Sequence, residues 1–143
     1  MQGMLESKEA EVIGPKTPKD QLPPVEFTPK VRDIILQRSG GRCEGCGEYQ
    51  PVQIHHRLYK SRGGRGTVPN GLALCGLGNT GGCHGIAHTG EGMELGWAIP
   101  SGSRPELWPA YRVGIGWVLY DDEGGFEPIT AATARLLTEG QVG

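Results

Sequence analysis

The chain has 143 residues, which is enough for one domain with one substantial hydrophobic core. Its 25 glycines and 11 prolines make up about a quarter of the residues, so helices and strands are expected to be short. A core this thin predicts an additional cross-link, such as a bound metal. The sequence shows no signal peptide and no apolar run long enough to cross a membrane, which predicts a cytoplasmic protein without a membrane partner.

The formal net charge of −2 hides an uneven distribution of charged side chains along the sequence. Residues 30–70 carry eight basic and three acidic side chains, a net charge of +5, whereas the segments on either side are net acidic. Four basic residues of this segment lie within nine positions, interleaved with glycines: Arg57, Lys60, Arg62 and Arg65. This pattern predicts contacts with nucleic-acid phosphates. A solvated basic loop is the alternative that charge alone leaves open.

Residues 1–27 contain four prolines among mixed charges and no sustained apolar period, which predicts a disordered or extended leader. Thr28 followed by Pro29 is typical of the N-terminus of a helix. Apolar residues at helical spacing come next, and Gly40 and Gly41 are expected to end this helix.

Two segments with strand character follow, at residues 51–57 and 71–75. The glycine-rich basic loop lies between them, so the two strands are expected to pair. A helix is predicted to begin near residues 82–84 and to run to about Glu91 or beyond. This helix would carry two histidines on one face.

The alternation of residues 111–120 and the turn-forming residues 121–125 predict a β-hairpin or small sheet. Residues 130–138 are expected to form a short helix. We therefore predict an α+β fold, with a core at residues 28–96. A β-rich C-terminal extension at residues 97–143 would pack on this core or trail it.

Four cysteines are spaced in two pairs. Cys43 and Cys46 are separated by two residues, a spacing that allows two thiolates to face one ion. Cys75 and Cys83 are farther apart, but the four glycines between them make that loop pliable. The four sulfurs together predict a structural zinc site, with disulfides or free thiols as the alternative. Chelation of this zinc is expected to loosen or unfold the domain.

The four histidines also fall in two pairs, which alternate with the cysteine pairs along the chain. His55 and His56 are adjacent on a predicted strand, so their side chains would face opposite ways and would not bind the same ion. His84 and His88 are four residues apart and would share one side of a helix, where both can bind a metal. One strand histidine is then available as a ligand while the other can act on a substrate.

The order of these cysteines and histidines, with Asn70 between the two histidine pairs, resembles the HNH endonuclease motif. The resemblance covers residues 38–90 and is to a zinc-knuckle subset of this family that is common in phage genomes. It implies a small ββα-metal (His-Me finger) core with a four-cysteine zinc knuckle, in which two strands and a helix surround one metal ion. A short helix would precede this core, and a tail containing a β-hairpin would follow it.

The resemblance also implies a role for each matching position. His56 would be the general base that takes a proton from the attacking water, and Asn70 would tie down the loop and orient that base. His55, His84 and His88 would bind one divalent ion. Because magnesium prefers oxygen ligands, this all-imidazole set favours manganese, nickel, cobalt or zinc over magnesium.

The implied activity is hydrolysis of phosphodiester bonds in double-stranded DNA, by nicking or double-strand cleavage. A phage terminase or another DNA-packaging protein is the implied protein partner, and the host-cell cytoplasm would be the compartment of a phage-encoded chain. The main alternative is a non-catalytic zinc-ribbon module that binds nucleic acid or protein, which leaves the four histidines without a function. A purely structural protein with two zinc sites is the second alternative.

Overall fold

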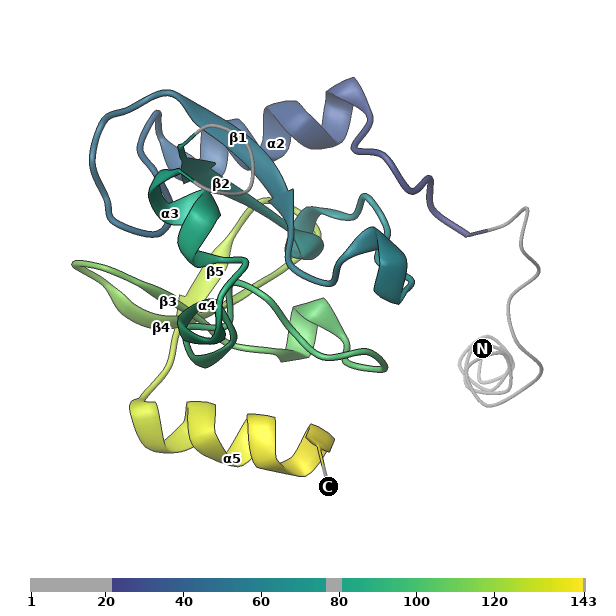
Figure 1. Ribbon diagram of the computed structural model, residues 1–143, viewed down its shortest axis with the longest axis vertical. Coiled ribbons are helices and arrows are strands. Elements are labelled where there is room, and N and C mark those ends of the chain that lie inside the picture. The colour runs from purple at the N-terminus through teal and green to yellow at the C-terminus, as the bar shows by residue number, and fades with distance from the viewer. Residues whose placement is uncertain (1–21, 77–80, 143) are drawn as a thin grey trace, which may run out of the picture.

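Two small antiparallel sheets form the framework of the computed structural model, which describes residues 22–76 and 81–142 (Figure 1). The first sheet pairs β1 (Val52–His56) with β2 (Gly71–Cys75), and the second has the order β3 (Ala110–Arg112), β4 (Gly116–Tyr120), β5 (Phe126–Pro128). Both predicted β-regions are therefore confirmed, and the C-terminal one is a three-stranded sheet. The fold is a small mixed α+β structure, as predicted.

Short helices cover these sheets. α2 (Pro29–Ser39) and α3 (Gly82–Ile86) both contact β2, and α5 (Ala131–Val142) contacts β4 (Figure 1). Three 3₁₀ turns complete the described structure: η2 (Lys60–Arg62), η3 (Val68–Asn70) and η4 (Pro105–Leu107). No helix in the described ranges is both long and apolar enough to cross a membrane.

The boundaries of α2 follow from its capping residues. The Thr28 hydroxyl accepts a hydrogen bond from the Val31 amide at 3.2 Å, so it satisfies one of the amides that a helix leaves unpaired at its first turn. Gly40 ends the helix in the left-handed conformation, with φ of 66°. The predicted helix is confirmed at both ends.

The prediction of one helix from about residue 82 to Glu91 or beyond is wrong. The chain instead forms α3 and a separate α4 (Gly90–Glu94), and His88 lies in the turn between them. Glycines are frequent in this segment and lower helix stability, so a continuous helix is not favoured. A Cβ atom at Gly92 would lie 2.6 Å from the backbone of Ala87, so α4 can fold back on the turn because residue 92 is glycine.

The C-terminal segment shares one hydrophobic cluster with the predicted core. Leu72 and Leu74 of β2 belong to the same buried cluster as Trp97, Val118 and Tyr120. Strands β3 and β4 therefore share one hydrophobic core with β2. Of the predicted leader, residues 1–21 lie outside the described residues, and the rest is irregular chain in contact with the loop that joins β1 and β2.

A buried ion pair connects α2 to the turn that carries the first two cysteines. The Glu44 carboxylate accepts hydrogen bonds from Arg38 Nε at 2.7 Å and Nη2 at 2.8 Å, and from the Ala73 amide at 2.9 Å. Both charged side chains are fully buried, and the Arg38 guanidinium lies 3.9 Å from the centre of the Tyr120 ring. Each buried charge is therefore compensated by its partner.

We expect Glu44→Gln to destabilise the protein by about 3–5 kcal/mol, because it leaves the buried Arg38 guanidinium without a counter-charge. Urea unfolding of the variant measures this loss. The matched control is Glu48→Gln, at an exposed position nearby, which should change the free energy of unfolding by less than about 0.5 kcal/mol. Equal effects of the two substitutions would contradict a stabilising role of the pair.

Candidate functional site

Four cysteine sulfurs meet at one end of the first sheet. The Sγ atoms of Cys43, Cys46, Cys75 and Cys83 all lie within 4.8 Å of one another, and none of the four forms a disulfide. The first two come from the turn after α2, the third from the end of β2 and the last from α3. This cluster could bind zinc, which in structural sites takes four ligands in a tetrahedral arrangement.

The electrostatics of the cluster fit a bound cation. Burial by itself would raise the pKa of the Cys43 thiol. The backbone amides of Cys46, Cys75 and Gly45 donate hydrogen bonds to Cys43 Sγ, however, and the pKa of this thiol is lowered as a result. Burial and the neighbouring Cys43 sulfur, in contrast, raise the pKa of Cys83 strongly. Several thiolates therefore cannot coexist here without a positive ion, which is what zinc supplies.

Trp97 connects this cluster to the histidines. A Cβ atom at Gly45 would lie 2.8 Å from the Trp97 ring, so the indole packs directly on the cysteine-bearing turn. The indole Nε1 donates to the Tyr111 carbonyl at 2.8 Å, and Trp97 is almost fully buried. Its backbone carbonyl is therefore held in a fixed place beside the end of β1.

Three histidines meet on the other side of Trp97. Nitrogens of His55, His84 and His88 lie within 4.8 Å of one another, and the centres of the three rings are 5.1–5.3 Å apart. They come from β1, from α3 and from the turn that follows it. The His88 ring stacks on Tyr59, with ring centres 5.1 Å apart and an angle of 22° between the planes.

Hydrogen bonds orient two of these imidazoles. His55 Nε2 donates to the Trp97 carbonyl at 2.7 Å, and His84 Nδ1 donates to Gln53 Oε1 at 3.1 Å. Because the donating nitrogens carry the protons, Nδ1 of His55 and Nε2 of His84 keep the lone pairs that a metal requires. Such outer contacts are typical of metal-binding histidines, and the donor set fits a divalent ion.

The protonation states suit metal binding as well. Burial, followed by the nearby His84 and His88, lowers the pKa of His55 to about 3. Burial and the nearby His88 also lower the pKa of His84. Both imidazoles are therefore neutral at pH 7, so no proton has to leave before a metal binds.

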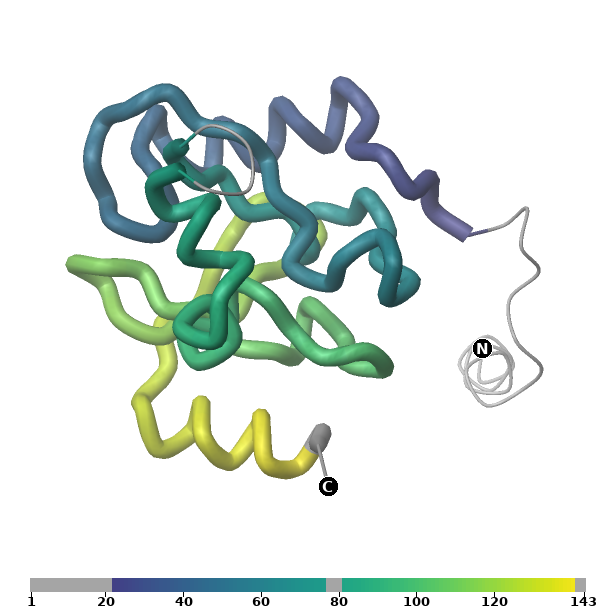
Figure 2. Tube along the Cα trace, in the orientation of Figure 1, coloured from purple at the N-terminus to yellow at the C-terminus, as the bar shows by residue number. Residues whose placement is uncertain are grey.

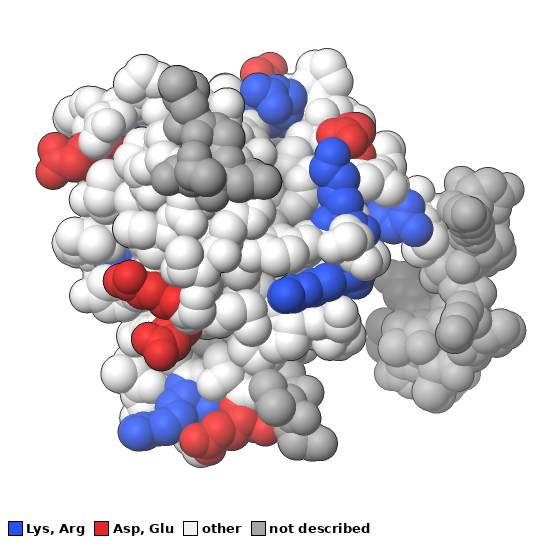
Figure 3. All heavy atoms as spheres, viewed as in Figure 1, with Lys and Arg blue, Asp and Glu red and all other residues white. Residues whose placement is uncertain are grey.

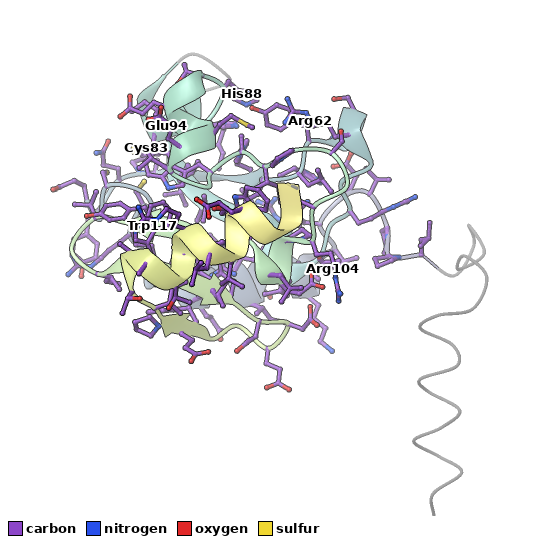
Figure 4. The ribbon with its side chains drawn as sticks, turned by 90° about the horizontal axis from the view of Figure 1, so that it is seen from below. Arg62, Cys83, His88, Glu94, Arg104 and Trp117 are labelled. Carbon is purple, nitrogen blue, oxygen red and sulfur yellow. The ribbon has the colours of Figure 1, made fainter. Side chains whose placement is uncertain are left out.

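His56 is not part of the three-histidine group. Its Nε2 donates to the Val25 carbonyl at 2.7 Å, and its ring packs on Phe27 with ring centres 4.2 Å apart. Burial lowers its pKa, so the ring is neutral at pH 7 and Nδ1 can accept a proton. All four histidines line one open cleft of about 460 Å³. In Figure 4, His88 lies at the same edge of the molecule as Arg62, whereas α5 crosses a different face.

Asn70 is buried. Its Oδ1 accepts a hydrogen bond from the Leu58 amide at 2.7 Å, and its Nδ2 donates to the carbonyls of Leu58 at 3.2 Å and Arg65 at 2.8 Å. The side chain therefore closes the loop between β1 and β2, directly after His56. It is not among the residues that line the cleft.

Arg57 does not fit its predicted role as a phosphate contact. The side chain is fully buried, and it donates hydrogen bonds to five backbone carbonyls, those of Gly96, Pro69, Pro105, Trp108 and Pro109. Burial lowers its pKa to about 10, so it remains charged at neutral pH. Its place at the end of β1 turns it into the interior, where it joins the core to the C-terminal segment and cannot reach DNA.

The three other predicted phosphate contacts lie at the surface, but their charged groups already have partners. Lys60 Nζ pairs with Glu26 at 2.7 Å, Arg62 Nη1 donates to the Ile99 carbonyl at 2.9 Å, and Arg65 Nη1 donates to the Pro23 carbonyl at 3.5 Å. Figure 3 shows basic side chains gathered along one side of this face, over α2 and the loop between β1 and β2.

Several residues of this site lie outside the motifs that the sequence analysis considered. Gln53 lies two positions before His55 on the same strand face, so strand alternation could have identified it. Arg32 of α2 lines the cleft but has no distinguishing sequence motif. Trp97 and Val25 act through backbone carbonyls, which every residue has.

Part of the chain matches a known restriction enzyme. Over 56 residues the chain is 39% identical to the Type IV methyl-directed restriction enzyme EcoKMcrA of Escherichia coli (strain K12), which covers 33% of this chain. The chain spans only about a fifth of the length of that enzyme, since the match covers 20% of it. No family model matches the chain. The chain therefore has a distant, partial similarity to a restriction enzyme.

Proposed function

We propose that the chain is an HNH-type endonuclease that hydrolyses phosphodiester bonds of double-stranded DNA with a divalent ion. In this proposal β1, β2 and α3 form a ββα-metal core, residues 28–96 form the catalytic part and the four cysteines hold a structural zinc. The partial similarity to a restriction enzyme supports the reaction class.

One observation carries the proposal. His55, His84 and His88 lie together at one side of an open cleft, two of them oriented by hydrogen bonds, and His56 lies on the same cleft with a different set of contacts. A purely structural zinc site would not need a fourth, separately oriented imidazole beside it. A non-catalytic zinc ribbon would need neither the three-histidine group nor His56.

The residues can divide the reaction between them. His56 Nδ1 takes a proton from a water molecule while the water oxygen attacks the phosphorus of the phosphodiester. His56 Nε2 stays hydrogen-bonded to the Val25 carbonyl. The bond from phosphorus to the 3′ oxygen then breaks, and that oxygen takes a proton from solvent. When bound by His55, His84 and His88, a divalent ion would supply positive charge to the phosphate and the leaving oxygen.

A supercoiled plasmid tests this function. We expect the full chain to convert it to nicked or linear DNA when manganese, nickel, cobalt, zinc or magnesium is added, and to lose this activity under mild chelation that leaves the four-cysteine site loaded. Gel electrophoresis separates the products. If no ion gives cleavage above background while the protein still binds DNA, the non-catalytic zinc-ribbon alternative replaces the proposal.

The biological setting rests on the sequence resemblance to small phage HNH proteins. We propose a phage terminase or another DNA-packaging protein as a partner, and the host-cell cytoplasm as the compartment. Recovery of a terminase subunit with the tagged chain from infected cells would support this partner. Its absence would remove the packaging role without affecting the proposed nuclease activity.

A further inference from the structure

The mouth of the histidine cleft carries an exposed ion pair. The Glu26 carboxylate lies 2.7 Å from Lys60 Nζ, and the two side chains are 75% and 52% exposed. Both residues line the cleft, as does Arg32, whose exposed side chain has no hydrogen bond or ion pair with the described residues. The cleft mouth therefore has two positive charges and a single carboxylate, apart from its histidines.

The chain around Glu26 is tied down at several points. The Pro24 carbonyl accepts a hydrogen bond from the Gly66 amide at 2.8 Å, and the Val25 carbonyl accepts one from His56. A Cβ atom at Gly66 would lie 2.4 Å from the Glu26 carbonyl oxygen, so the two backbones touch. Figure 2 shows this N-terminal segment running beside the loop between β1 and β2. The fold itself therefore places the Glu26 carboxylate at the cleft mouth.

We propose that Arg32 and Lys60 form a binding subsite for a DNA phosphate, and that Glu26 occupies it as an internal competitor until DNA displaces it. The proposal rests on the proposed function, because it takes DNA as the ligand. A carboxylate and a phosphate both offer oxygens to the Lys60 ammonium, so they exclude each other. An exposed ion pair contributes little to stability, which makes this exchange easy.

The charge of Glu26 is maintained at neutral pH. The hydrogen bond and the charge of Lys60 lower the pKa of the Glu26 carboxyl. It therefore repels an incoming phosphate as well as neutralising Lys60. Its removal should increase the positive potential at the cleft mouth, on which both the affinity for DNA and its salt dependence depend.

Binding of a short fluorescent DNA duplex tests this subsite, in titrations at several salt concentrations without added divalent ion. We expect Glu26→Gln to lower the Kd about two- to fivefold. Arg32→Gln and Lys60→Gln should each raise the Kd and reduce the slope of log K against log salt by about one. The matched control is Glu127→Gln, which removes an exposed carboxylate on β5 and should leave the Kd unchanged.

The double variant Glu26→Gln/Lys60→Gln tests whether the two residues act on the same phosphate. The gain in DNA affinity from Glu26→Gln should be largely lost when Lys60 is also replaced by glutamine. If Glu26→Gln leaves the Kd unchanged or raises it, Glu26 positions Lys60 and the competitor proposal is overturned. An unchanged salt slope in both Arg32→Gln and Lys60→Gln overturns the subsite.

These outcomes are independent of cleavage. A protein that shows the expected shifts in Kd but does not nick plasmid DNA keeps the subsite and loses the proposed nuclease activity. A protein that cleaves plasmid DNA but shows no effect of Glu26→Gln on binding keeps the nuclease activity and loses the subsite. A chain that does not bind the duplex at any salt concentration contradicts the subsite directly.

Discussion

We expect His56→Ala to cleave supercoiled plasmid about 10²–10⁴ times more slowly than the wild-type chain, which is the usual contribution of a general base. The reason is that His56 lines the cleft, is neutral at pH 7 and has only Nδ1 free to accept a proton. Initial rates of nicking under saturating manganese measure the loss. The Kd for a DNA duplex should change little, because the loss affects the chemical step.

A second substitution separates catalysis from folding. His56→Gln can still donate a hydrogen bond to the Val25 carbonyl, but its amide cannot act as a base. It should therefore keep the contact with the N-terminal segment and lose the same activity as His56→Ala. Zinc content and thermal unfolding of His56→Gln should match the wild type closely. A rate within about threefold of wild type in both variants would exclude His56 as the base.

Removing the ion from the four-cysteine cluster should unfold the domain. Structural zinc in small domains binds with about 10–16 kcal/mol, whereas a whole domain is stable by only about 5–15 kcal/mol. Three of the four cysteines are buried here, and the cluster belongs to the main hydrophobic core together with Trp97. Loss of the ion would leave buried thiols that cannot ionise together.

Circular dichroism during thermal unfolding, with zinc content measured in parallel, follows this loss. A strong chelator and the Cys83→Ser variant should both abolish the cooperative transition. Mild chelation that strips only the three-histidine site is the matched control, and it should shift the unfolding temperature little. A cooperative transition at an unchanged temperature after complete zinc loss would show that the cluster does not hold the fold together.

Much of the local structure follows from short stretches of sequence. Thr28 and Gly40 mark the ends of α2, and the spacing of the alternating residues predicts β1 and β2, because capping and strand alternation depend on near neighbours in the chain. Pairs of cysteines and histidines are recognisable in the same way. Their residue types bind metals in a wide range of folds, so residue type and spacing are enough to group them.

The sequence by itself therefore determined the α+β class, the paired strands and the two groups of metal-binding residue types. Only the tertiary structure decided that Arg57 is buried, that His88 lies in a turn, and that Arg32 and Glu26 reach the cleft. The backbone carbonyls that hold the imidazoles leave no mark in the sequence, because every residue carries one. Likewise, whether a charged side chain is buried depends on which distant carbonyls surround it, and that follows from the packing of the whole chain.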